Sequence, residues 1–149
     1  MKYDDASWHY EGEFPADLPK EAGATHIGMF LTWMLLHDFA SEELAEDASE
    51  AIEALKARQM TGANFLIKEL DEKLTDNEFT DEGNAFALAY YQGPEHKSQY
   101  VGDYMLTFPL EGGSLYSVAD TWMNYDKLSG QIDARYRTWV ADGRPEYIF

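Results

Sequence analysis

The feature that most constrains the fold is an apolar stretch at residues 27–36 (IGMFLTWMLL). Around an expected helix over residues 22–39, large apolar side chains point in nearly every direction, and helices of that kind are usually buried. A membrane-spanning helix needs about 20 apolar residues, so this stretch is too short to be one. We therefore predict a central, buried helix. Gly28 within it costs up to about 1 kcal/mol relative to Ala, which close packing of another backbone would offset.

Amphipathic spacing predicts further helices around this one. Residues 100–108 fit either a strand or a helix, and the glycine pair at 112–113 follows as a break. Cap residues, glycines and prolines mark the other boundaries. The helices are expected over residues 48–55, from Thr61 to about residue 74, over 84–91, and over 117–140. With an irregular, proline-punctuated N-terminal segment at residues 3–21, these elements predict one mainly α domain of five or six helices over residues 1–149.

The net charge restricts the class of partner. Eleven Lys and Arg stand against 28 Asp and Glu, which gives −17 on 149 residues. Such a surface repels nucleic acid and anionic membranes, and it speeds encounters with basic proteins. The chain lacks cysteine and a readable signal peptide, so we expect a cytoplasmic protein.

The negative charge is concentrated in two stretches. Residues 38–53 hold seven acids and no Lys or Arg, and residues 69–82 hold seven more with Lys73 as the one basic residue. A solvated helix face explains either stretch alone, but two on one small domain favour a deliberate anionic surface. The acids of the first stretch that we expect to contact a basic partner are Glu42, Glu43, Glu46, Asp47 and Glu50.

The N-terminal segment offers a second candidate site. Asp4, Asp5, Trp8 and His9 lie within six residues, and His26 stands in the predicted central helix. Carboxylates and neutral imidazoles bind metals and exchange protons. The simpler explanation of Asp4 and Asp5 is that their side chains cap or hydrogen-bond the local backbone. No HExxH, GxSxG or phosphate-loop pattern accompanies them, so we expect neither catalysis nor a resident metal or cofactor.

His26 and His37 share one face of the predicted central helix. Eleven residues at 1.5 Å each separate them by about 16 Å, too far for one metal ion. They are expected to be polar groups at the two ends of a buried helix.

Three stretches, YDDASWHY at residues 3–10, FPADLP at 14–19 and ATHIGMFL at 24–31, resemble a bacterial family of unknown function. Later stretches (DEGNAFA at 81–87 and YVGDY at 100–104) extend the resemblance over most of the chain. Small acidic proteins of this kind look like immunity proteins encoded beside antibacterial toxins. The resemblance implies no catalytic residues.

These observations favour an immunity protein, not an enzyme, that binds and neutralises a cognate toxin through its acidic surface. Aromatic side chains of the N-terminal segment are expected to add apolar anchors. The alternative is a small-ligand- or metal-binding enzyme with a pocket near Asp4, Asp5, Trp8, His9 and His26. A third possibility is an adaptor in a larger assembly. The oligomeric state stays open.

Overall fold

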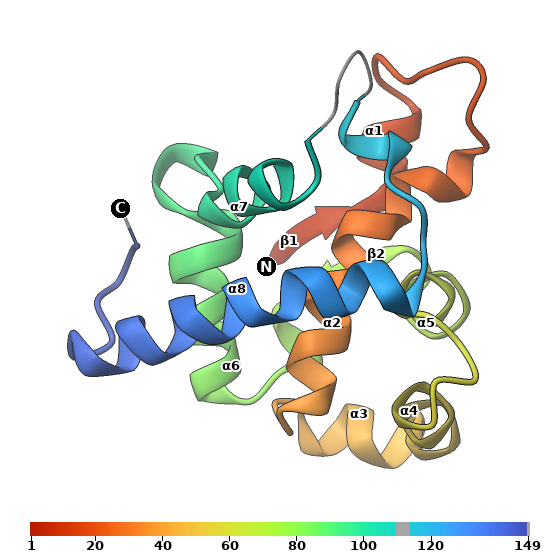
Figure 1. The fold of residues 1–149 in the computed structure, drawn as a ribbon. Helices are drawn as coiled ribbons and strands as arrows, with labels where there is room; N and C mark the ends of the chain where they lie inside the picture. Colours follow the sequence, from red (N-terminus) through yellow and green to blue (C-terminus); the bar gives the residue numbers. More distant parts are fainter. Residues whose placement is uncertain (110–113, 149) are drawn as a thin grey trace.

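The computed structural model describes residues 1–109 and 114–148. Within them the chain forms eight α-helices, a short π-helix and a two-stranded sheet (Figure 1). The prediction of a mainly helical domain is confirmed. The α-helices are α1 (Ala6–Tyr10), α2 (Thr25–Leu36), α3 (Glu42–Asp47), α4 (Ser49–Lys56), α5 (Gly62–Glu69), α6 (Asp81–Phe86), α7 (Gln99–Thr107) and α8 (Trp122–Ala141). The strands are β1 (Lys2–Asp5) and β2 (Lys73–Thr75), the π-helix is Ala87–Gln92, and 3₁₀ turns cover Lys20–Ala24, Asp76–Glu78, Pro94–His96 and Leu115–Ser117.

Helix α2 is the predicted central helix, with eleven of its twelve residues buried. It packs along α5, and α8 crosses it in Figure 1. A Cβ on Gly28 would overlap the backbone nitrogen of Ala63, and one on Gly62 would overlap the carbonyl oxygen of Gly28. The close backbone approach expected at Gly28 is therefore present, and glycine is required on both helices.

The start of the chain is more regular than expected. Strand β1 pairs antiparallel with β2, with Lys2 opposite Thr75 and Asp4 opposite Leu74, and a bulge lies between Lys2 and Asp4. A bulge interrupts the alternation of side chains along a strand. Tyr3, Asp4 and Asp5 are consequently all buried, although they are consecutive. Sequence alone could not reveal this pairing, because β2 lies about seventy residues away.

Capping side chains begin most of the predicted helices. Thr61 accepts a hydrogen bond from a backbone N–H group in the first turn of α5, as expected, but the helix ends at Glu69 and not near residue 74. Thr80 is the N-cap of α6, which starts at Asp81, earlier than the expected residue 84. Ser98 is likewise the N-cap of α7, so residues 100–108 form a helix and not a strand. Helix α8 begins at Trp122, later than expected, because Thr121 is its N-cap. Gly112 and Gly113 lie outside the described residues.

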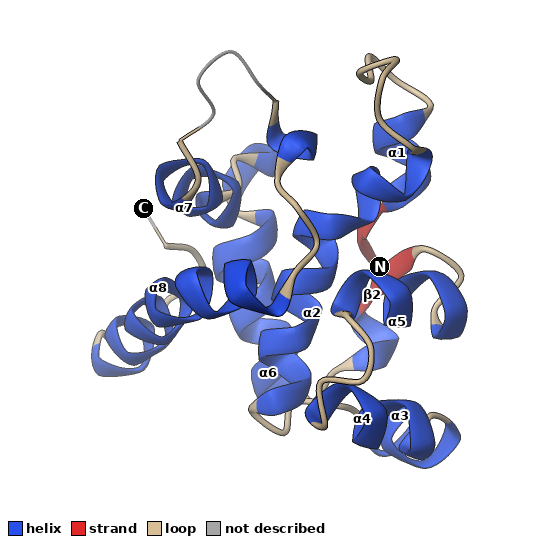
Figure 2. Cartoon of the chain, turned by 45° about the vertical axis from the view of Figure 1, so that its right-hand side comes forward, coloured by secondary structure: helices blue, strands red, loops and turns tan. Residues whose placement is uncertain are grey.

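The two ends of α2 have different surroundings. Figures 1 and 2 both place α1 and β1 beside its N-terminal half, and α3 and α4 at its C-terminal end. Among the described residues, no helix combines the length and apolar character needed to cross a bilayer.

Candidate functional site

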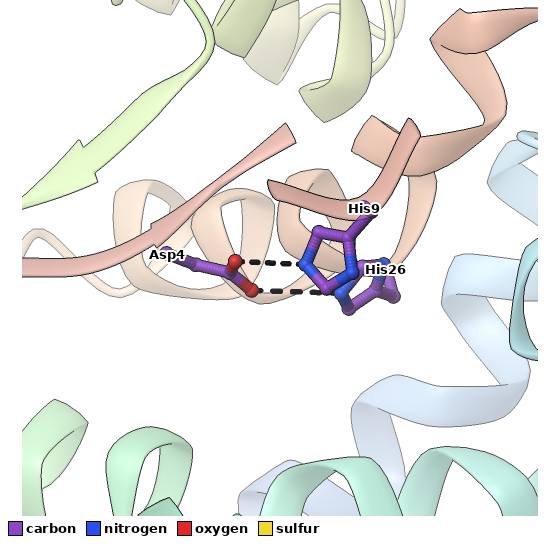
Figure 3. A group of neighbouring side chains, drawn as sticks. All are labelled: Asp4, His9 and His26. Atoms are coloured by element: carbon purple, nitrogen blue, oxygen red, sulfur yellow. Dashed lines mark hydrogen bonds and ion pairs between the residues drawn. The ribbon is translucent and has the colours of Figure 1, made fainter. Parts of the chain in front are cut away.

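Asp4, His9 and His26, which we call the Asp–His cluster, meet beside the N-terminal half of α2 (Figure 3). One donor atom from each lies within 4.8 Å of the other two. His9 Nε2 lies 2.8 Å from Asp4 Oδ1, and His26 Nε2 lies 3.5 Å from Asp4 Oδ2. The two imidazole rings stand edge to face with centroids 4.5 Å apart. Three of the five residues proposed for the N-terminal pocket are thus brought together.

Local structure explains how the cluster assembles. Asp4 is on β1, and Asp5 is the N-cap of α1, accepting hydrogen bonds from the backbone N–H and the hydroxyl of Ser7. Helix α1 therefore starts directly after the strand and carries His9 back beside Asp4. His26 lies in the first turn of α2, where the hydroxyl of Tyr100 donates to its carbonyl oxygen over 2.6 Å.

The cluster contacts two tyrosines that sequence reasoning missed, and one of them, Tyr91, is buried. Tyr91 donates its hydroxyl to Asp4 Oδ2 over 2.5 Å, and Asp5 donates its backbone N–H to Asp4 Oδ1 over 2.8 Å. The Tyr116 hydroxyl lies 2.7 Å from His9 Nδ1. Tyr91 belongs to the π-helix, a rare conformation that is frequent at functional sites.

The environment sets the charge of the cluster. Burial raises the pKa of the Asp4 carboxyl, but the adjacent His26 and His9 outweigh burial and hold that pKa well below its ordinary value. Burial lowers the pKa of the His26 imidazole, and this effect exceeds the opposing attraction of Asp4. Burial, reinforced by the charge of Asp4, raises the pKa of Tyr91 well above its ordinary value, so its hydroxyl stays a donor. At neutral pH the cluster contains a carboxylate beside a neutral imidazole.

His26 is the least satisfied member of the cluster. Its side chain is 1% exposed, yet neither ring nitrogen has a hydrogen-bond partner among the described residues. A buried polar group without a partner costs roughly 1–3 kcal/mol, so natural proteins rarely leave one. Asp4 Oδ2 faces Nε2 at the 3.5 Å given above.

Asp5 and Trp8, the other two candidates, lie outside the cluster. Asp5 caps α1 and pairs with Lys2 over 2.9 Å, which fits the local role considered for it. Trp8 is 55% exposed, with the Lys2 ammonium over its ring. His37, at the far end of α2, stacks on Trp33 and lies 3.3 Å from Asp133.

The candidate partner-binding acids form a separate surface, which we call the acidic face: Glu42, Glu43, Glu46, Asp47 and Glu50 on α3 and α4. All five are exposed. None forms an ion pair with a Lys or Arg of the described residues.

A groove of about 190 Å³ joins this face to the second acidic stretch. Glu43 and Asp47 of α3 line it together with Glu69 and Glu78, while Leu44 and Leu70 add apolar surface. Burial raises the pKa of Glu78, although its hydrogen bonds to Thr75 oppose the shift. The fold thus brings together two acidic stretches that are separate in the sequence.

The family described as "Domain of unknown function (DUF7832)" matches residues 2–118. The chain belongs to this family. Membership of a family of unknown function is therefore confirmed, and the link to immunity proteins stays a prediction. No curated protein and no solved structure matches the chain. The part that matches DUF7832 includes the whole Asp–His cluster with Tyr91 and Tyr116, and it ends before α8.

Proposed function

We propose that the protein is a non-catalytic binding protein that neutralises a toxin by engaging basic residues of that toxin through the acidic face. The observation that carries the proposal is the meeting of two acidic stretches around one groove, with exposed carboxylates that lack basic partners within the described residues. A concentrated negative potential of this kind accelerates association with a cationic surface and suppresses wrong partners.

The placement of the acids also supports a binding role. Glu46 and Asp47 occupy the last turn of α3, which holds no basic residue. Carboxylates there meet the negative end of the helix dipole and repel one another, so they destabilise the free protein slightly. A cationic partner would remove that repulsion. Residues that lower stability without serving the fold are those expected at functional surfaces.

The apolar anchors of the interface are expected outside the N-terminal segment, whose aromatic side chains were the first candidates. Trp8 is exposed, but it belongs to α1, which lies away from α3 and α4 in Figures 1 and 2. The apolar part of the interface is instead expected at the groove, where Leu44 and Leu70 line the wall between the acids. The contact would then combine a small apolar centre with a charged rim.

Killing assays between kin cells test this function in the native host. A strain without the gene is expected to be killed by kin that secrete the toxin, and the wild-type gene is expected to restore survival. The variant Glu43→Lys, Glu46→Lys, Asp47→Lys should fail to restore it. The matched control, Glu11→Lys, Glu13→Lys, Asp17→Lys, makes the same charge change at exposed acids elsewhere and should protect normally.

A binding measurement complements the killing assay. Tagged protein recovered from its own cells is expected to retain one stoichiometric basic protein, and the acidic-face variant should associate with it at least about tenfold more slowly and with a weaker salt dependence. Survival of the gene-deleted strain would favour an adaptor role. Equal association rates for the two charge-reversed variants would place the interface elsewhere.

A further inference from the structure

We infer that the Asp–His cluster is a binding site for a divalent first-row transition-metal ion such as Zn²⁺, with Asp4, His9 and His26 as its three protein ligands. This site lies on different elements from the acidic face, and the inference does not depend on the proposed function. It departs from the expectation, drawn from sequence, that the protein holds no metal.

The donor atoms lie close enough together to share one such ion. Ligands about 2.0–2.1 Å from Zn²⁺ lie about 3.4 Å apart in a tetrahedron. His9 Nε2 lies 2.8 Å from Asp4 Oδ1, and His26 Nε2 lies 3.5 Å from the other carboxylate oxygen, Oδ2, so the two imidazoles approach the same carboxylate. One donor atom from each residue lies within 4.8 Å of the other two.

The residue types are those of ligands. Metals bind carboxylates and imidazoles, and they compete with protons at each of these groups. One carboxylate and two imidazoles suit Zn²⁺ or Fe²⁺ better than Ca²⁺ or Mg²⁺, which prefer oxygen ligands.

His26 supplies the independent observation. Its imidazole is buried, its Nε2 faces Asp4, and neither nitrogen has a hydrogen-bond partner within the described residues. A metal ion would satisfy Nε2, because the lone pair of that nitrogen would bind the ion while the ring proton stays on Nδ1.

Second-sphere groups are already in place. With His9 Nε2 on the ion, the ring proton would sit on Nδ1, and the Tyr116 oxygen 2.7 Å away would accept its hydrogen bond. Tyr91 meanwhile donates to Asp4 Oδ2 and orients the carboxylate. Three protein ligands leave a tetrahedral ion one position for a water molecule or a substrate, as in catalytic and not in structural zinc sites.

Titration of the intact, chelator-treated protein with Zn²⁺ tests the site. One ion per chain should bind, and the melting temperature should rise with Zn²⁺ concentration. His26→Gln and His9→Gln should each weaken Zn²⁺ binding at least about tenfold. Co²⁺, used as a spectroscopic probe, should show the visible absorption of a nitrogen- and oxygen-ligated ion, and each substitution should remove it.

Matched controls keep the test decisive. His37→Gln alters the C-cap residue of α2, a histidine that also lies beside a carboxylate, Asp133, and it should leave Zn²⁺ binding unchanged. If His26→Gln does not fold, His9→Gln carries the test, because its side chain is 20% exposed. No binding by the wild type, equal binding by His9→Gln, or displacement of Zn²⁺ by equal concentrations of Ca²⁺ would overturn the inference.

Discussion

Polar and charged side chains are buried beside one end of α2 and exposed at the other. Beside its N-terminal half, Asp4 and His26 are buried, and hydrogen bonds tie Asp4 to Tyr91, 87 residues away, and His9 to Tyr116, 107 residues away. At the C-terminal end, the acidic face is exposed to solvent without ion pairs among the described residues. The cluster therefore depends on the whole fold, whereas the acidic face depends on two short helices. Substitutions near the cluster should alter stability, and substitutions on the acidic face should alter association.

The largest expected effect on stability is that of Gly28→Val, two residues after His26 in α2. The new side chain would collide with the backbone of Ala63, which cannot rotate away. We expect the free energy of unfolding in urea to fall by about 3 kcal/mol or more. Gly130→Ala in α8 is the control, since its Cβ would meet nothing within 4 Å, and it should stabilise the protein by up to about 1 kcal/mol. Equal stability of the two variants would contradict the close packing of α2 on α5.

Acidification should have the next largest effect, a loss of folding stability that originates in the Asp–His cluster and not in the acidic face. The pKa of His26 is lowered in the folded protein from an ordinary value of 6.5, so below that pH the unfolded chain binds a proton that the folded protein does not. Stability contributed by the neutral ring is complete above pH 6.5 and declines as pH falls below it. Asp4, whose folded pKa is also lowered, adds its own loss below about pH 4.

Thermal unfolding over this pH range measures both contributions. His26→Gln removes the titrating ring and should flatten the decline between about pH 6.5 and pH 5, whereas His37→Gln should keep it. An unchanged pH profile for His26→Gln would mean that the buried ring does not govern acid stability.

The smallest effect is expected from Glu46→Lys, Asp47→Lys on the acidic face. Lysines in the last turn of α3 meet the negative end of the helix dipole favourably and remove repulsion between acids. The melting temperature should rise slightly at low salt, by the equivalent of less than about 1 kcal/mol, and the gain should shrink at high salt. A clear loss of stability would show that these acids serve the fold.

The elements that the sequence predicted are those with local signals. The all-round apolar character of residues 27–36, Gly28 and Thr61 each specify one helix or one close contact. The end of the helix that begins at Thr61 was wrong, since residues 73–75 form β2. The pairing of β1 with β2 was not foreseen, since short strands with a bulge carry no alternating pattern.

The candidate site could be predicted only in part, for the same reason. Asp4 and His9 are near in sequence, and their residue types suggested a site together with His26. Tyr91 and Tyr116 carried no signal, because one lies in an apolar helical stretch and the other follows a glycine-rich break. Asp5 resembled Asp4 in sequence, yet capping of α1 directs it to Ser7 and Lys2 instead.

The contact between Tyr91 and Asp4 is made from a π-helix, Ala87–Gln92, and not from an α-helix. A π-helix turns each residue by less than the 100° of an α-helix, so it orients its side chains differently from an α-helix over the same residues. In such an α-helix Tyr91 would keep its identity and point in another direction. The contact with Asp4 therefore depends on the backbone conformation of this segment as much as on its residues.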